Sequence, residues 1–153
     1  MTNENRPIKA VPESTILNGT SHPTGQVFTF GPNGEFSIAV RKQTAPTSCG
    51  QALLEMQGHP LEETEVEDPG YEVSTFDLFV NFEGKEIKPS NYMPETPYMI
   101  LGLKKATGCT HWYLRINDNI IDPERGVIEN AQDYEGREIA KIEAVMKIPF
   151  KSK

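Results

Sequence analysis

The sequence predicts an α+β protein in which a helix packs against an antiparallel β-sheet. Residues 49–56, CGQALLEM, place apolar side chains at positions i, i+3, i+4 and i+7, which is the repeat of one face of an α-helix. Residues 111–116, HWYLRI, instead alternate as a half-buried strand does. Residues 26–42 contain two more alternating runs around Gly-Pro-Asn-Gly, which is the pattern of a β-hairpin.

These elements fit into one domain. The chain has 153 residues, of which 37% are hydrophobic, and this is enough for a core of ordinary size. Residues 1–25 are polar and contain three prolines, so we expect an extended arm with little regular structure. A single domain then covers residues 26–153. The sequence contains no repeat, coiled coil or low-complexity tract.

The predicted helix at residues 49–56 presents Cys49 in its first turn. Thr47 or Ser48 can serve as the N-cap, and Gly58 followed by a proline ends the helix. A thiol at this position lies at the positive end of the helix dipole, which favours the thiolate. Because the thiolate attacks carbonyl groups, Cys49 is a candidate nucleophile, and a neighbouring histidine would complete its activation.

His111 is the candidate for that histidine. It lies on a predicted strand and points away from the apolar row that begins with Trp112. We expect Trp112 to pack in the core, with a wall of a substrate channel as the alternative. His22 lies in the polar N-terminal segment and His59 lies between a glycine and a proline, so neither is expected on a rigid element.

Two further residues stand at informative distances from this pair. Gln43 precedes Cys49 by six positions, and Asp122 stands with a following proline after the histidine strand. Cys49 is followed by glycine and a helix, and His111 is followed by apolar residues on a strand. This order and spacing resemble the papain-like cysteine peptidases over residues 43–123, especially the compact bacterial branch that includes the bacteriocin-processing peptidases.

The resemblance implies a papain-like fold and a papain-like site. Cys49 would be the nucleophile, His111 the general acid and base, Asp122 the residue that orients the histidine ring, and Gln43 a donor to the oxyanion. The implied function is a thiol hydrolase that cleaves a peptide, isopeptide or amide bond in a peptide or protein substrate, without a cofactor or metal.

Two other classes of function stay open. One is a deamidase or transglutaminase-type effector, or a cell-wall amidase, because the same three side chains permit attack on a glutamine amide or transfer to an amine. The other is a binding or structural protein that keeps a papain-like shell without turnover. The reaction product separates the enzymatic classes, and ordinary reactivity of Cys49 would favour the binding protein.

The position of Asp122 depends on the turn that precedes it. A simple hairpin with Asp118 and Asn119 as its turn pairs Arg115 with Asp122. Asp122 would then lie four residues along from His111, roughly 14 Å away and too far for direct contact. A longer loop or a β-bulge would instead bring Asp122 opposite His111.

Composition excludes several partners. The formal net charge is −7, and nucleic-acid binding requires clustered lysine and arginine that this chain lacks outside its short C-terminal tail. The chain has no phosphate-binding loop, dinucleotide fingerprint or zinc ligand set. The N-terminus has no apolar run, so we expect no membrane insertion and a cytoplasmic location, with leaderless delivery by a secretion machine or a phage particle as the alternative. The oligomeric state stays open.

The second cysteine and an acidic segment have alternative interpretations. We expect Cys109 to be an inert thiol, although a disulfide to Cys49 could switch the enzyme off, and a metal shared by both cysteines with His111 is a further alternative. Residues 62–68 contain five carboxylates. We expect a solvated loop there, with a cleft rim that attracts basic substrate residues as the alternative.

A second helix is predicted over residues 73–84, VSTFDLFVNFEG. Ser74 or Thr75 can cap it, and a glycine ends it. A strand is the alternative because the segment is rich in phenylalanine. Its apolar residues are Phe76, Phe79 and Phe82, together with Leu78.

The remaining segments are predicted to be strands. Residues 85–89 form a short strand, and residues 98–103, YMILGL, form a buried one. Residues 138–150 return as a last strand, although the first half of this segment could be helical.

Overall fold

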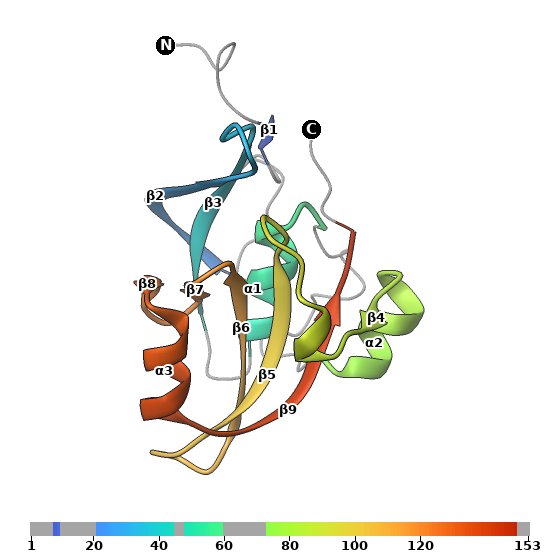
Figure 1. Ribbon diagram of the computed structural model, residues 1–153, viewed down its shortest axis with the longest axis vertical. Helices are drawn as coiled ribbons and strands as arrows, with labels where there is room; N and C mark the ends of the chain where they lie inside the picture. Colours follow the sequence, from blue (N-terminus) through green and yellow to red (C-terminus); the bar gives the residue numbers. More distant parts are fainter. Residues whose placement is uncertain (1–7, 10–20, 45–47, 60–72, 150–153) are drawn as a thin grey trace.

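The structure is a computed structural model that describes residues 8–9, 21–44, 48–59 and 73–149. Within these ranges it contains three α-helices and a six-stranded antiparallel sheet, so the predicted α+β class is confirmed. The strands of the large sheet follow the order β4-β9-β5-β6-β7-β8 (Figure 1). The elements along the chain are β1 (Ile8–Lys9), β2 (Ser21–Phe30), β3 (Phe36–Gln43), α1 (Cys49–Met56), α2 (Thr75–Asn81), β4 (Lys85–Glu86), the 3-10 helix η3 (Pro89–Asn91), β5 (Tyr98–Lys104), β6 (Thr110–Ile116), β7 (Asn119–Asp122), β8 (Gly126–Glu129), α3 (Ala131–Glu138) and β9 (Ile139–Lys147).

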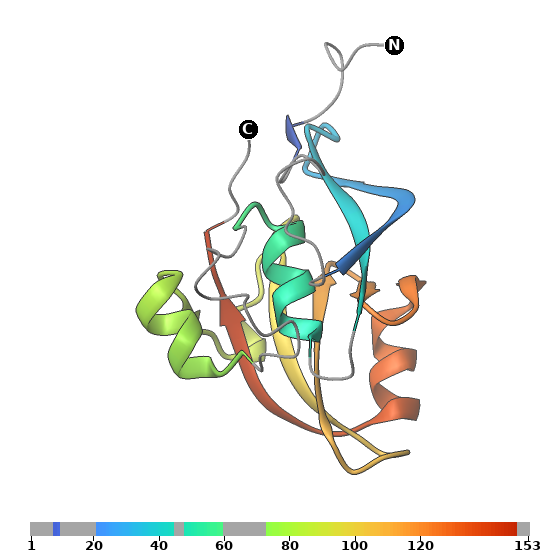
Figure 2. The same ribbon diagram turned by 180° about the vertical axis from the view of Figure 1, so that it is seen from behind.

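The large sheet has a core on each face. Trp112 and Leu114 pack in the core that contains α1, as the alternation predicted, whereas Tyr113 packs with Tyr134 of α3 in a second core, so β6 is more deeply buried than the predicted half-buried strand. Figure 2 shows α1 lying across one face of the sheet, with the β2–β3 hairpin beside it. The predicted packing of the Cys49 helix on an antiparallel sheet is therefore confirmed.

Helix α1 is more deeply buried than its sequence pattern predicted. All its residues are buried, including Gln51 and Glu55 on the side that the pattern left polar. The reason is that α1 packs against both β3 and β6. Glu55 is held on the hairpin side by the hydroxyl of Ser21, and Ser21 in turn accepts a hydrogen bond of 2.6 Å from Arg41.

The β2–β3 hairpin agrees with the predicted pattern but extends further toward the N-terminus. Phe30 pairs with Phe36 around a turn closed by a bond from Gly34 N–H to Gly31 O at 2.9 Å. Strand β2 begins at residue 21 and β1 pairs with β3, so the prediction of an irregular arm through residue 25 is corrected for these parts. The rest of the arm lies outside the described residues.

The ends of α1 follow two different rules. At its C-terminus, Gly58 has a φ of 91° and His59 N–H bonds back to Leu54 O, which is the glycine stop that the sequence predicted. At its N-terminus, Ser48 occupies the cap position, but its hydroxyl accepts a bond from Thr44 N–H and does not cap the helix. The predicted capping bond is therefore absent at this serine.

Helix α2 confirms the predicted second helix, but only part of its apolar pattern packs inward. Ser74 forms a reciprocal capping box with Asp77, and Gly84 N–H bonds to Leu78 O at the far end. Leu78 is fully buried, whereas Phe76 and Phe79 are among the exposed hydrophobic residues. Phe82 also packs against the core, so two of the four apolar positions face inward and the two exposed phenylalanines lie on the side of this short helix that the large sheet does not cover.

The C-terminal part of the chain contains two elements that the sequence did not predict, β8 and α3. The predicted last strand is confirmed as β9, and helix α3 directly precedes it. Asn130 is the N-cap of α3, and its side chain accepts a hydrogen bond from Asp133 N–H. Ala131 and Tyr134 are buried and lie three positions apart on its inner face. This helix brings the Tyr134 hydroxyl to Asp122.

Gly50 allows α1 to approach the sheet closely. A Cβ atom at this position would lie 2.8 Å from Val73 Cβ and 3.1 Å from Trp112 Cδ1. Trp112 Nε1 also donates to Val73 O at 2.9 Å, so these three residues join the start of α1, strand β6 and the residue before the α2 cap. The glycine that follows Cys49 therefore has a packing role.

The substitution Gly50→Ala tests this contact. We expect it to lower the free energy of unfolding by about 1–3 kcal/mol, because overpacking forces neighbours to move. The matched control is Gly136→Ala in α3, where a Cβ atom meets nothing within 4 Å. The control should raise the stability by about 0.5–1 kcal/mol. Urea denaturation measures both, and equal stability of Gly50→Ala and wild type would contradict the packing role.

Candidate active site

The structure brings Cys49 and His111 together at the start of β6. The backbone N–H of Trp112 donates to Cys49 Sγ at 3.4 Å, and the side chains of Cys49 and His111 are hydrogen-bonded. Strand β7 pairs with β6 only as far as Leu114, so β7 does not extend to the Trp112 N–H. The end of β7 therefore makes room for the N-terminus of α1. Cys49 and His111 are both buried.

Asp122 is the second partner of His111. The distance between His111 Nε2 and Asp122 Oδ1 is 3.0 Å. The turn between β6 and β7 is formed by Asn117 and Asp118, one residue earlier than predicted, so the alternative of a longer loop or bulge is not needed. Continuing the observed register places Asp122 two positions from His111 along the ladder, as a diagonal neighbour. Diagonal Cα atoms lie about 7–8 Å apart, within reach of these two side chains.

Asn117 explains why the turn has this position. Its φ is 55°, in the left-handed region that asparagine tolerates better than most residues. Its side chain donates to Glu95 Oε2 at 2.8 Å and accepts from Glu95 N–H at 2.9 Å. This contact with a segment distant in the sequence selects one register among those that the local sequence permits.

The Asp122 carboxylate is fully buried and accepts three hydrogen bonds. Oδ1 accepts from His111 and from the backbone N–H of Glu124 at 2.8 Å, and Oδ2 accepts from Tyr134 Oη at 2.9 Å. A buried carboxylate is tolerated only when it is paired and hydrogen-bonded in this way. Asp122 is thereby held in one orientation toward the histidine ring.

These contacts keep both members of the pair charged. Burial lowers the pKa of His111, but its bonds with Asp122 and Cys49 outweigh burial and raise the pKa to about 9. Burial raises the pKa of Asp122, but the His111, Glu124 and Tyr134 bonds outweigh it and lower the pKa below its ordinary value. The ring nitrogen Nε2 of His111 faces the Asp122 carboxylate, so Nδ1 is the ring nitrogen that can interact with Cys49.

Gln43 lies beside this network. Its backbone N–H donates to Pro123 O at 2.8 Å, so the end of β3 is joined to the residue that follows Asp122. The side chain is half-buried. The structure thus brings Gln43 to the same side of the protein as Asp122, and the role of its amide at an oxyanion stays a prediction.

Sequence reasoning missed Tyr134. It lies in a polar segment, AQDYEGRE, that gave no strong helical pattern. The spacing of Ala131 and Tyr134 was the available signal, since residues three apart share one face of a helix. Tyr134 is fully buried, and its ring lies edge-on to Tyr113.

The other residues that the sequence singled out lie outside the His111–Asp122 network or in the core. Trp112 is in the core, as predicted. Cys109 is exposed in the β5–β6 turn and is not bonded to Cys49, since both are free cysteines. His22 lies on β2, contrary to prediction, and His59 packs edge-on against Phe82 with a ring nitrogen on Pro149 O. The acidic run at residues 62–68 lies outside the described residues.

One group within the described residues has the ligand types and spacing of a metal site. It comprises His111, Asp122 and Glu124, whose ligand atoms lie within 4.8 Å of one another. Other interactions already involve these atoms: Asp122 Oδ1 accepts two hydrogen bonds, and Glu124 Oε1 lies 3.3 Å from Lys104 Nζ. We therefore assign the group to a hydrogen-bonded pair with a neighbouring carboxylate.

Comparison of the sequence with models of known protein families gave no match, and no curated protein matches it. None of the helices in the described part of the chain has the length and apolar character of a membrane-spanning segment. A functional proposal for this chain therefore depends on the geometry of the site itself.

The charge of His111 has a testable consequence for stability. Its pKa in the folded state is about 9, above the unfolded value of about 6.5. The protonated ring therefore stabilises the fold fully below about pH 6.5, and this contribution is lost as the pH rises through about 9. NMR titration of the His111 ring should show the raised midpoint, and Asp122→Asn should lower it. A wild-type midpoint near 6.5 would contradict the pairing.

Tyr134 has a closely matched control. Tyr134 and Tyr113 are both fully buried, and each donates its hydroxyl proton to a carboxylate, that of Asp122 at 2.9 Å and that of Glu135 at 2.8 Å. We expect Tyr134→Phe and Tyr113→Phe each to cost about 1.5–3 kcal/mol of stability. Only Tyr134→Phe should raise the pKa of Asp122, measured by carboxyl carbon NMR. An equal shift in both variants would show a general structural effect and contradict the specific role of Tyr134.

Proposed function

We propose that this protein is a papain-like thiol hydrolase that cleaves a peptide, isopeptide or amide bond. The observation that carries the proposal is the His111–Asp122 pair of 3.0 Å, with Cys49 hydrogen-bonded to the same ring. Three residues from separate elements, α1, β6 and β7, meet in the order nucleophile, base and orienting carboxylate. This is the geometry that activates a cysteine for acyl transfer.

Each side chain has a role that follows from its position. The Cys49 thiolate attacks the carbonyl carbon and forms a tetrahedral oxyanion. His111 gives its proton to the departing amine, and a Cys49 thioester remains. Water then attacks the thioester as His111 takes a proton from it, and collapse of the second tetrahedral intermediate releases the carboxylic acid and restores the Cys49 thiolate beside the protonated His111. Asp122 holds the ring and stabilises its charged form throughout.

The oxyanion would be stabilised at the N-terminus of α1. Ser48 does not cap this helix with its side chain, so the serine does not occupy the N–H groups of the first turn. The positive end of the helix dipole favours negative charge there. The amide of Gln43 would add a donor from the β3 end, which is joined to Pro123.

A deamidase or transamidase is the second candidate. The same acyl-enzyme forms from a glutamine side chain, with ammonia as the leaving group, and an amine can replace water in the second step. The site is compatible with hydrolysis, deamidation and transamidation, because these reactions differ in the substrate that reaches Cys49 and in the acceptor, which is water or an amine. A non-catalytic protein would keep the buried His111–Asp122 pair without an activated thiol.

The first experiment measures alkylation of Cys49 by iodoacetamide against pH, in a Cys109→Ala background. We expect rapid labelling well below pH 8 that is lost in His111→Ala, because the imidazolium stabilises the thiolate. An ordinary thiol reacts fast only as the pH approaches about 8.5. Labelling of that ordinary kind, unchanged in His111→Ala, would overturn the catalytic proposal and leave the non-catalytic class.

A product assay then separates the enzymatic classes. Peptide libraries incubated with the protein are followed by mass spectrometry for chain cleavage, for glutamine deamidation and for amine incorporation. Chain cleavage that requires Cys49 and persists with a chelator supports the hydrolase. Cysteine-dependent deamidation without cleavage would assign the second candidate, and activity lost with the chelator would point to the His111, Asp122 and Glu124 group.

A further inference from the structure

Arg125 connects the turn after β7 to helix α3. Its backbone N–H donates to Asp122 O at 3.0 Å. Its guanidinium carbon lies 5.4 Å from the centre of the Tyr134 ring, and Nη2 donates to Glu138 Oε2 at 2.7 Å. Tyr134 and Glu138 are four positions apart on α3 and therefore share one face of the helix. These contacts hold the Arg125 guanidinium in a defined position over the Tyr134 ring.

The ring beneath Arg125 belongs to the tyrosine that donates to the buried carboxylate. Tyr134 Oη lies 2.9 Å from Asp122 Oδ2, and a cation over an aromatic face is attracted by the π-electrons of the ring. Burial raises the pKa of Tyr134, and Asp122 and Glu138 raise it further, whereas the Arg125 charge opposes this rise. A phenol whose pKa is lowered is a stronger hydrogen-bond donor. Arg125 therefore favours the bond that Tyr134 makes to Asp122.

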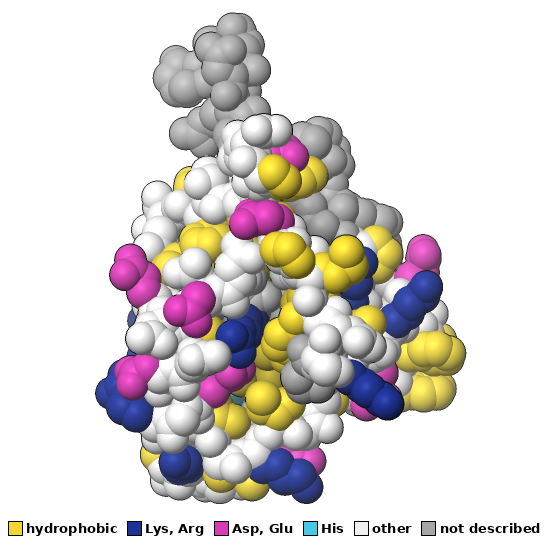
Figure 3. All heavy atoms as spheres, in the orientation of Figure 1, with side chains coloured by type: hydrophobic (Ala, Val, Ile, Leu, Met, Phe, Trp, Pro, Cys, Tyr) yellow, Lys and Arg dark blue, Asp and Glu magenta, His cyan; other side chains and the backbone are white. Residues whose placement is uncertain are grey.

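Charged and titratable groups from several elements surround Asp122. The groups that face it or its hydrogen-bond partners are His111 of β6, Tyr134 and Glu138 of α3, Glu124 and Arg125 of the turn after β7, Lys104 of β5 and Cys49 of α1. Figure 3 shows acidic and basic side chains next to one another over the α3 side of the molecule, at its left edge. Lys104 pairs with Glu124 at 3.3 Å. Among the described cations, Arg125 is the one that lies over the Tyr134 ring.

We propose that Arg125 is a positioning residue of the candidate site, which steadies the Tyr134 ring and strengthens its hydroxyl as the donor that orients Asp122 toward His111. Because Asp122 in turn holds the histidine ring, the role of Arg125 in catalysis rests on the proposed function, whereas its role in the hydrogen-bond network does not. The Arg125 side chain is 46% exposed, so solvent screens its charge, and its effect should be smaller than that of the Tyr134 hydroxyl itself.

The test measures the pKa of Asp122 by carboxyl carbon NMR in the full chain. We expect Arg125→Gln to raise this pKa, because the positive charge over the ring is lost, and to raise it less than Tyr134→Phe does. Arg125→Lys keeps a positive charge but loses the planar group that stacks on the ring, so it should restore only part of the difference. Amide NMR spectra of each variant establish that it is folded.

A double-mutant cycle shows whether Arg125 acts through Tyr134. We expect Arg125→Gln to shift the Asp122 pKa at least about twofold less in the Tyr134→Phe background than in the wild type, since the effects of residues in contact are not additive. A role for Arg125 in stability alone would not produce this coupling in the Asp122 pKa.

The variant Glu138→Gln separates the two contacts that Arg125 makes with α3. It removes the charged partner of the 2.7 Å ion pair and leaves the Arg125 charge beside the Tyr134 ring. If the contact with the ring is the one that acts on Asp122, this variant should not raise the Asp122 pKa.

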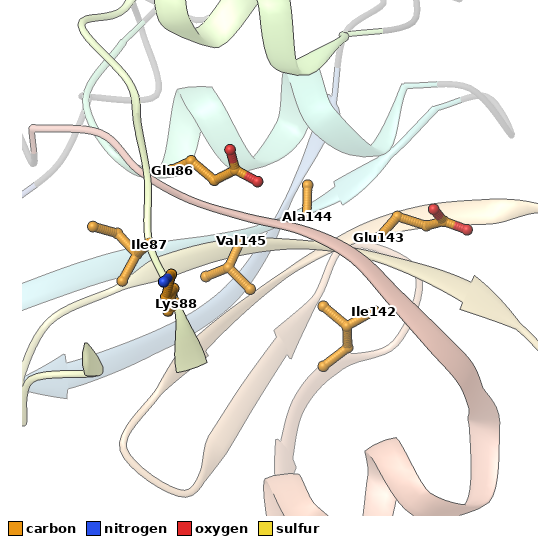
Figure 4. Close-up of a pocket in the computed structure, with 7 residues that line it drawn as sticks. All are labelled: Glu86, Ile87, Lys88, Ile142, Glu143, Ala144 and Val145. Carbon is orange, nitrogen blue, oxygen red and sulfur yellow. The ribbon is translucent and has the colours of Figure 1, made fainter. Parts of the chain in front are cut away.

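Two further variants control for the loss of a positive charge. Arg137→Gln removes one from α3 itself, where Arg137 pairs with Asp133 at 2.9 Å. Lys88→Gln removes one near β4, at the opposite edge of the large sheet from β8, where Lys88 lines a groove beside β9 (Figure 4). Both should leave the Asp122 pKa unchanged, because each is an exposed charge that solvent and salt screen.

Three results would overturn the proposal. The first is an unchanged Asp122 pKa in Arg125→Gln, and the second is an equal shift with and without the Tyr134 hydroxyl. The third is a full shift in Glu138→Gln, which would assign Arg125 to the packing of α3 alone. Because the readout is the Asp122 carboxyl group, failure of the proposed hydrolase chemistry at Cys49 would leave the expected shifts in place.

Discussion

The buried carboxylate of Asp122 is the constraint on which the candidate site depends. An ionised carboxylate without solvent is costly, and here three donors offset that cost: a ring nitrogen of β6, a backbone N–H in the turn after β7 and a tyrosine hydroxyl of α3. Removing any one of these donors leaves the buried Asp122 carboxylate with fewer hydrogen bonds to offset the cost of its charge. The pair with His111 therefore connects the chemistry of the site to the packing of three elements.

A second constraint holds the nucleophile in position. The close contact of Gly50 with Val73 and Trp112 lets α1 lie near enough to β6 for Cys49 Sγ to accept the Trp112 N–H. Helix α1 is also buried between β3 and β6, so it has little freedom to move away. A site built on rigid elements keeps its geometry better than a site on loops.

The sequence by itself determined the local elements and singled out most residues of the candidate site. The repeat at residues 49–56, the glycine after it, the capping box of Ser74 and the alternation around His111 all depend on neighbours along the chain, and the structure confirms these elements. Tertiary structure alone decided three things: the register that brings Asp122 to His111, the exposure of Phe76 and Phe79, and the contact of Tyr134. The physical reason is that each depends on a distant partner. Glu95 holds Asn117 in the turn, the sheet covers only one side of α2, and α3 packs where the Asp122 carboxylate accepts its tyrosine proton.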